Sequence, residues 1–166
     1  MSRCFLTLSL CLLAPIMLAT NSATAQSRQM LEPGGWSVHQ GANGLQVDYP
    51  AGLFTVGAGP TEKGEGQKFR SADGHFEFAA YSLANAEKDS PRTYLRKNLL
   101  VRPESLIYRR VTDQFFVMSS IRDGRIFYSR CNFAAGIHCI YLEYPQGQKL
   151  AWDPIVTRVS HSLRPR

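Results

Sequence analysis

The chain has 166 residues, of which 44% are hydrophobic, and its 19 Lys and Arg exceed its 13 Asp and Glu to give a formal net charge of +6. This length suits one domain with a buried core and argues against a second domain of ordinary size. The excess charge is local, because residues 92–130 hold nine Lys and Arg against three Asp and Glu.

The first 25 residues have the three parts of a cleavable secretory signal in the correct order. Arg3 gives a short basic start, residues 5–18 are mostly apolar, and an A-x-A cleavage site ends at Ala25. The apolar stretch is shorter than the roughly 20 residues that span a bilayer. We therefore predict a periplasmic or secreted protein without a membrane span after cleavage. The predicted organisation is a signal peptide at residues 1–25, a flexible lead-in at 26–35 and a single globular domain at 36–166.

Short strands are predicted for the N-terminal half of this domain. Alternating apolar residues end at Pro50, and an Asp73-Gly74 pair predicts the turn of a hairpin. Residues 57–66 contain four glycines and are predicted as a flexible loop. The predicted strands are residues 36–40, 45–49, 54–56, 67–71 and 76–80.

Two helices are predicted. Ser90 is a suitable N-cap residue and Pro91 suits the first helical position, so the first helix begins there and ends near Leu100. The second helix is predicted from apolar residues at steps of three and four, with Pro154 in its first turn. These residues are Trp152, Ile155, Val156, Val159 and Leu163.

Two turns predict the strand register of the C-terminal half. Asp123-Gly124 is typical of a two-residue hairpin turn. A three-residue loop at 134–136, with Gly136 in the left-handed conformation, pairs Cys131 with Cys139. Directly opposed residues lie about 4.5–5.5 Å apart, within disulfide reach, and these two cysteines are the ones left after signal cleavage. Because an exported protein meets an oxidising compartment, we predict a Cys131–Cys139 disulfide.

This meander of hairpins implies an α+β fold, with a mostly antiparallel sheet covered by about two helices toward one side. One face of the meander is apolar and is expected to face the core. Its residues are Phe115, Val117, Ile121, Ile126, Tyr128, Ile140, Leu142 and Tyr144. The opposite face mixes polar and apolar residues with the two cysteines, so we expect it to be partly exposed.

Several segments resemble small exported proteins of alphaproteobacteria. The similarity rests on Tyr49-Pro50 followed by Phe54, on residues 126–133, on Tyr144-Pro145 and on the closing stretch 152–165. More loosely, the early Tyr-Pro strand, the long meander and the terminal amphipathic helix resemble the PsbP/Mog1-like α/β/α sandwich. The first resemblance implies no particular activity, and the second implies a binding or accessory module.

One polar group lies at the end of the predicted apolar face. In the predicted register Asn132 faces His138, and Arg130 and Tyr128 follow along the same face. Arg130 can bind a ligand carboxylate or phosphate through two hydrogen bonds, and His138 is a titratable donor. The alternative is that these residues only satisfy one another at the polar end of a hairpin.

The positive central region gives a second hypothesis. Arg92, Arg96 and Lys97 lie toward solvent on the first predicted helix and would form a face for an anionic partner. That partner would be a protein or an anionic component of the cell envelope, and nucleic acid is not expected for an exported protein. The alternative is an ordinary solvated helix face.

No motif identifies a catalytic centre. The sequence lacks a G-x-S-x-G signature, and its four histidines show neither H-E-x-x-H nor i, i+4 spacing. We therefore predict no catalytic, metal or cofactor site, and a non-enzymatic accessory or binding protein with a basic surface for an anionic partner. The alternative is a small periplasmic hydrolase, which requires a nucleophile and a base within hydrogen-bond reach in a pocket.

Overall fold

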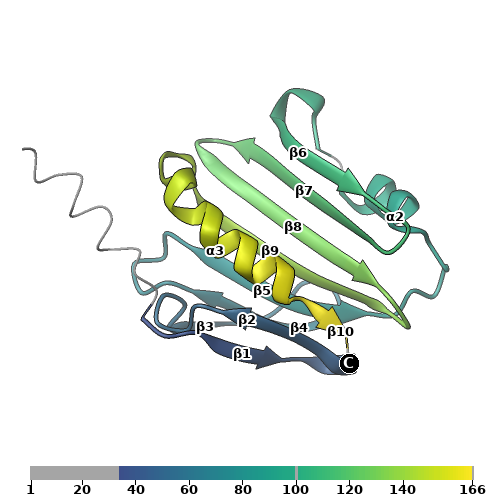
Figure 1. Ribbon diagram of the computed structural model, residues 1–166, viewed down its shortest axis with the longest axis horizontal. Helices are drawn as coiled ribbons and strands as arrows, with labels where there is room; N and C mark the ends of the chain where they lie inside the picture. Colours follow the sequence, from purple (N-terminus) through teal and green to yellow (C-terminus); the bar gives the residue numbers. More distant parts are fainter. Residues whose placement is uncertain (1–33, 100, 166) are drawn as a thin grey trace, which may run out of the picture.

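A seven-stranded antiparallel sheet forms the centre of the computed structural model, which describes residues 34–99 and 101–165 (Figure 1). The strand order is β3-β4-β5-β9-β8-β7-β6. The strands are β3 (Val56–Pro60), β4 (Glu65–Arg70), β5 (Glu77–Leu83), β6 (Leu106–Val111), β7 (Phe115–Arg122), β8 (Arg125–Phe133) and β9 (Ile137–Pro145). The predicted signal peptide and most of the predicted lead-in lie outside the described residues.

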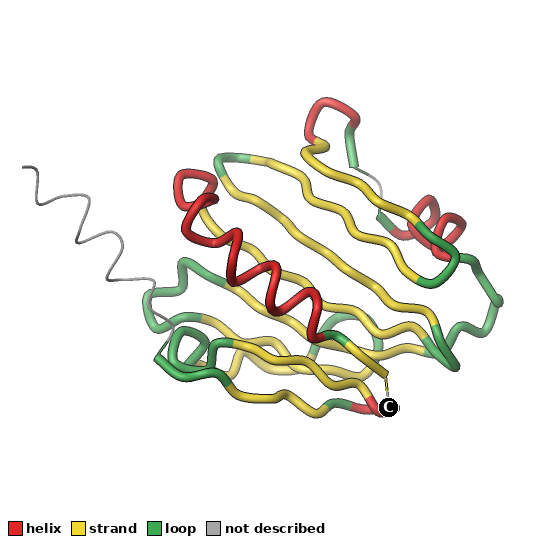
Figure 2. Tube along the Cα trace, viewed as in Figure 1, coloured by secondary structure: helices red, strands yellow, loops and turns green. Residues whose placement is uncertain are grey.

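Helix α3 and a small second sheet cover one face of this large sheet (Figure 2). The helix spans Lys149–Ser162, after a 3-10 turn η3 at Gln146–Gln148. The small sheet has the order β1-β2-β10, with bounds Ser37–Gln40, Leu45–Tyr49 and Arg164–Pro165, and η1 (Ala42–Gly44) joins its first two strands. The architecture is α+β, as predicted. The early strands nevertheless form a separate sheet instead of extending the meander.

Helix α2 (Pro91–Asn98) packs on the opposite face, where Tyr94 and Leu95 contact a second core around Phe116 and the disulfide. The expectation that both helices lie toward one side is therefore wrong. The physical reason is that the disulfide-bearing face carries its own apolar patch, which has to be covered. Away from α2 this face is partly exposed, as predicted. A 3-10 turn η2 (Pro103–Ser105) leads from the α2 region into β6.

The predicted core face of the meander packs beneath α3. Val117, Ile126, Tyr128, Ile140, Leu142 and Tyr144 are all buried there, and Phe115 is partly buried against them. Trp152 of α3 is fully buried, and its ring stacks on that of Tyr144 with centroids 4.9 Å apart. This aromatic contact anchors the N-terminal half of α3. Within the described residues, no helix is both long and apolar enough to cross a membrane.

The predicted register of the meander is confirmed. Asp123 and Gly124 both have positive φ, at 51° and 72°, which is the conformation of a type I′ hairpin turn. Cys131 lies directly opposite Cys139, and the two form a disulfide. Gly136, however, does not have a positive φ. It suits its position for another reason, since a Cβ there would lie 3.0 Å from the Leu83 carbonyl oxygen.

The glycine-rich segment and the two helices differ from their predictions, and the bounds of several predicted strands shift by one to three residues. The glycine-rich segment is not all loop, because its first half pairs with β4 as the bulged edge strand β3, where Pro60 is tolerated. Helix α3 begins at Lys149, so Pro154 lies in its second turn; a Lys149–Asp153 ion pair spans its first turn. Helix α2 begins as predicted, with the Ser90 hydroxyl accepting a hydrogen bond from the Thr93 N–H, but it ends at Asn98.

Candidate anion-binding site

A groove of about 510 Å³ lies between helix α2 and strand β6, on the face of the sheet that carries the disulfide. Its floor is apolar and consists of Leu95, Leu99, Val101, Leu106, Val111 and Met118. Arginine side chains complete the lining: Arg92, Arg96, Arg102 and Arg109. The groove therefore joins an apolar surface to a set of guanidinium groups.

Three separate segments bring these arginines together. Arg92 and Arg96 are four residues apart on α2, so they share one side of the helix. Arg109 is paired with Met118 across the β6–β7 ladder and points to the same face of the sheet. Arg102 directly precedes η2, in the connection that closes the groove.

The charge of the groove is largely uncompensated. Arg92, Arg96 and Arg109 make no ion pair with any described residue, and Arg102 has one exposed partner, Glu104, at 3.6 Å. An exposed pair of this kind contributes little, typically about 0–1 kcal/mol. The positive potential of the groove is therefore available to an anion.

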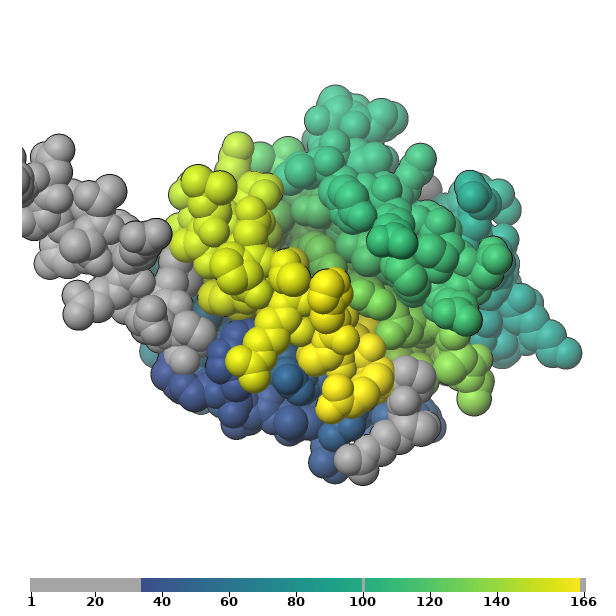
Figure 3. All heavy atoms as spheres, in the orientation of Figure 1, coloured from purple at the N-terminus to yellow at the C-terminus, as the bar shows by residue number. Residues whose placement is uncertain are grey.

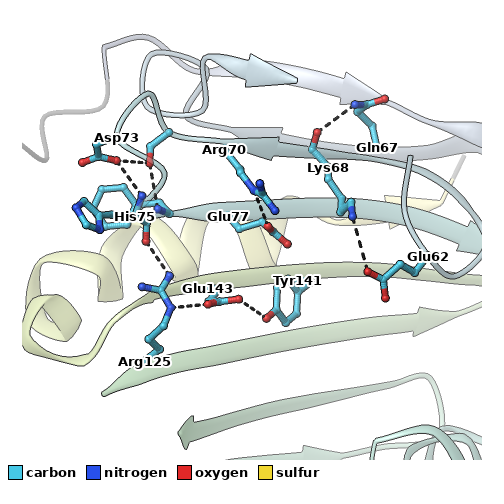
Figure 4. Close-up of polar contacts among 12 residues, drawn as sticks. Glu62, Gln67, Lys68, Arg70, Asp73, His75, Glu77, Arg125, Tyr141 and Glu143 are labelled. Atoms are coloured by element: carbon cyan, nitrogen blue, oxygen red, sulfur yellow. Dashed lines mark hydrogen bonds and ion pairs between the residues drawn. The ribbon is translucent and has the colours of Figure 1, made fainter. Parts of the chain in front are cut away.

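Elsewhere on the same face of the sheet, three cations are paired with carboxylates (Figure 4). Arg70 donates to Glu77 at 3.0 Å, and Lys68 lies 3.8 Å from Glu62. Arg125 donates to Glu143, which also accepts a hydrogen bond from the Tyr141 hydroxyl at 2.8 Å. Arg122, at the end of β7, has only an exposed contact with Asp123 at 3.9 Å. The groove differs in bringing several arginines together, three of them without an ion pair to a described residue.

Lys97, the third predicted residue of the basic helix face, lies outside the groove. Its ammonium group donates to Glu87 at 2.6 Å and to Asp89 at 2.7 Å. Both hydrogen bonds raise the pKa of Lys97, and the bond to Asp89 makes the larger contribution. The structure therefore unites Arg92 and Arg96 but leaves Lys97 neutralised by two carboxylates.

Three of the four predicted ligand-binding residues lie together beneath the C-terminal part of α3. Arg130 Nε donates to Asn132 Oδ1 at 3.0 Å, and the Asn132 amide donates to the Leu163 carbonyl at 2.9 Å. The hydroxyl of Tyr128 donates to Ser160 Oγ at 2.6 Å, and Arg130 Nη1 donates to the same oxygen at 3.3 Å. The hydrogen bonds of Asn132 are thus made within the protein, which agrees with the alternative that these polar residues satisfy one another.

His138 lies opposite Asn132 in the register but bonds elsewhere. Its Nδ1 is 2.9 Å from the hydroxyl oxygen of Ser82, and that hydroxyl donates to the Ala42 carbonyl at 2.9 Å. The single proton of the Ser82 hydroxyl is used in the hydrogen bond to Ala42. The proton between Ser82 and His138 is therefore assigned to His138 Nδ1, which donates to the Ser82 oxygen. Burial lowers the pKa of His138, and its neutral form suits this contact.

The Ser82–His138 pair bears on the hydrolase alternative. Both side chains are buried, with exposed fractions of 1% and 2%, and His138 donates to Ser82 in this arrangement instead of accepting its proton. Ser82 therefore lacks the activation that a nucleophilic serine needs. In the part of the chain that the structure describes, no group of three His, Cys, Asp or Glu side chains is arranged to hold a metal ion.

Sequence reasoning missed Arg102 and Arg109 as members of the groove. Strand alternation predicts that Arg109 and Arg110 point to opposite faces, but it does not tell which face meets α2. That choice depends on the packing of the helix. Arg102 follows a segment with no periodic signal.

No protein-family model and no curated protein matches the chain. The resemblance to exported alphaproteobacterial proteins and to PsbP/Mog1-like folds stays a prediction. The function is therefore argued from the groove itself.

Proposed function

We propose that this protein is an exported, non-enzymatic binding protein whose groove holds a soluble amphipathic anion. The acidic group of the ligand lies among Arg92, Arg96 and Arg109, and its apolar chain lies on the apolar floor of the groove. The observation that supports this proposal is the combination of unpaired guanidinium groups with a continuous apolar floor. The disulfide is compatible with an exported protein.

Both parts of the ligand contribute to this binding. A hydrogen bond to a charged group contributes about 1.5–3 kcal/mol where water is excluded, but an exposed ion pair contributes only about 0–1 kcal/mol. Each buried CH₂ contributes about 0.8 kcal/mol. The arginines are exposed, so salt screens their attraction for the acidic group. A small anion without a chain and a neutral molecule with the same chain should each bind more weakly than the amphipathic anion.

The test uses three probes below their critical micelle concentrations. Calorimetry with dodecanoate should show saturable binding at one site, and that binding should weaken as salt is added. Acetate and dodecyl maltoside should bind at least about tenfold more weakly, because each lacks one of the two contributions. Equal affinity for dodecanoate and dodecyl maltoside would contradict a role for the arginines.

Helix α2 provides a matched control. Arg96→Gln and Lys97→Gln each remove one positive charge from adjacent exposed positions, but only Arg96 lines the groove. Arg96→Gln should weaken dodecanoate binding about fivefold, and Lys97→Gln should leave it within about twofold. Equal effects of the two substitutions would show a general charge effect and would overturn the proposed site.

A vesicle measurement separates a soluble amphiphile from a membrane surface. Sedimentation with phosphatidylglycerol vesicles reports surface binding, which requires no groove. We expect dodecanoate to bind in the absence of vesicles and to compete with any vesicle binding. Vesicle binding without dodecanoate binding would replace the proposed ligand with a membrane surface.

A further inference from the structure

A second cavity lies on the other face of the large sheet, between α3 and strands β6, β7 and β8. Its volume is about 250 Å³, and its polar lining comes from Tyr108, Arg110, Tyr128, Arg130, Thr157, Ser160 and His161. Figure 3 shows the surface hollowed between α3 and β6. The groove lies on the opposite face of the sheet, and no residue lines both the groove and this cavity.

Two arginines without a counterion meet in this cavity. The guanidinium carbons of Arg130 and Arg110 lie 4.6 Å and 5.5 Å from the centre of the Phe115 ring. No acidic residue lines the cavity, and neither arginine forms an ion pair within residues 34–99 and 101–165. Burial lowers the pKa of Arg130, and the charge of Arg110 acts in the same direction. A bound anion would compensate both charges.

The structure holds Arg130 in place before any ligand binds. Its Nε donates to Asn132, which is itself anchored to the Leu163 carbonyl, and its Nη1 donates to Ser160. A guanidinium group has five N–H donors, and these contacts use two of them. The remaining donors are therefore oriented at little further cost in side-chain entropy. Asn132 acts as a positioning residue for Arg130.

We propose that this cavity is a binding site for a phosphate group, separate from the groove. Arg130 and Arg110 supply two positive charges and several N–H donors, which match the charge and the multiple oxygens of a phosphate. His161 lines the same cavity and adds a donor. The aromatic rings of Tyr108 and Phe115 leave an apolar wall for the organic part of a phosphomonoester.

The test follows the side-chain Nε–H signals of the arginines by NMR during titration. Inorganic phosphate probes the free anion, and phenyl phosphate probes an ester with an organic part. Saturable shifts of the Arg130 signal are expected with both, and the tighter ligand identifies the source of the phosphate group. Shifts that do not saturate with either ligand would overturn the site.

Neighbouring residues of β6 provide the control variants. Arg110→Gln removes a charge from this cavity and should weaken phosphate binding about tenfold, whereas Arg109→Gln removes an equal charge from the opposite face and should not. Arg130→Lys keeps the charge but loses the planar fork, so it should also weaken binding. Equal effects of Arg109→Gln and Arg110→Gln would overturn the site. Dodecanoate binding in the groove should instead be weakened by Arg109→Gln and not by Arg110→Gln. The phosphate site and the groove can therefore be tested independently.

Discussion

Arg109 and Arg110 are consecutive residues of β6 whose side chains line cavities on opposite faces of the seven-stranded sheet. Arg109 is paired with Met118 and borders the groove, whereas Arg110 is paired with Val117 and borders the cavity beneath α3. Because successive strand residues alternate between faces, one edge strand supplies a cation to each site. The basic character of the central region is thereby divided between two surfaces.

Charge reversal on α2 should abolish binding of the amphipathic anion. Replacing both Arg92 and Arg96 by Glu converts attraction into repulsion at the groove and should lower dodecanoate affinity by at least about 100-fold at low salt. The wild-type affinity should fall between 50 mM and 500 mM salt, roughly as Debye screening requires. An affinity that does not depend on salt would indicate an ordinary solvated helix face.

Removing the disulfide should lower stability without abolishing the fold. The bond closes a nine-residue stretch between Cys131 and Cys139, for which chain entropy predicts about 2.6 kcal/mol, an upper value because the hairpin already restricts the unfolded chain. The double variant Cys131→Ser/Cys139→Ser should therefore have a lower melting midpoint and an unchanged far-ultraviolet spectrum. Thiol counting on the denatured, unreduced exported protein should find no free cysteine, and two free thiols would contradict the bond.

One buried histidine, His138, and one half-buried histidine, His39, should make the protein less stable in mild acid. Burial lowers the pKa of both His39 and His138 in the folded state. The unfolded chain therefore binds more protons below about pH 6.5, so the free energy of unfolding falls as the pH drops through that value. His39→Gln and His138→Gln should each flatten the dependence of the melting midpoint on pH between 7 and 5. An unchanged slope in the double variant would disprove this role.

Helix α3 offers a matched pair for measuring the core beneath it. Ile155 is 5% exposed and packs on the sheet, whereas Leu150 on the same helix is 87% exposed. Ile155→Ala should cost about 2–5 kcal/mol, and Leu150→Ala, which removes the same number of atoms, should cost less than about 0.5 kcal/mol. Urea unfolding of both variants gives the two values. Similar values would contradict the packing of α3 on the sheet.

The predicted signal peptide implies a defined mass for the mature protein. If residues 1–25 are a cleaved signal, the protein isolated from the periplasm should begin at Gln26, and intact-mass measurement should show this end. A full-length species retained in the membrane would contradict the signal peptide.

The register of the meander could be predicted from the sequence because its causes are local. The Asp123-Gly124 turn and the spacing of the cysteines fix which residues oppose each other, and the two-residue period of a strand then assigns Val117 and Tyr128 to one face. The start of α2 has an equally local cause in the Ser90 hydroxyl. For these elements, neighbours in the chain carry the necessary information.

The tertiary structure alone decided which charges act together. Arg96 lies on α2 and Arg109 on β6, and they line one groove because α2 packs on the disulfide-bearing face while α3 packs on the other. Lys97 follows Arg96 directly, yet its charge is compensated by Glu87 and Asp89. The local sequence pattern predicts to which face of its own helix or strand a side chain points. The contacts between distant elements determine what that side chain meets, since those contacts depend on the burial of the whole core.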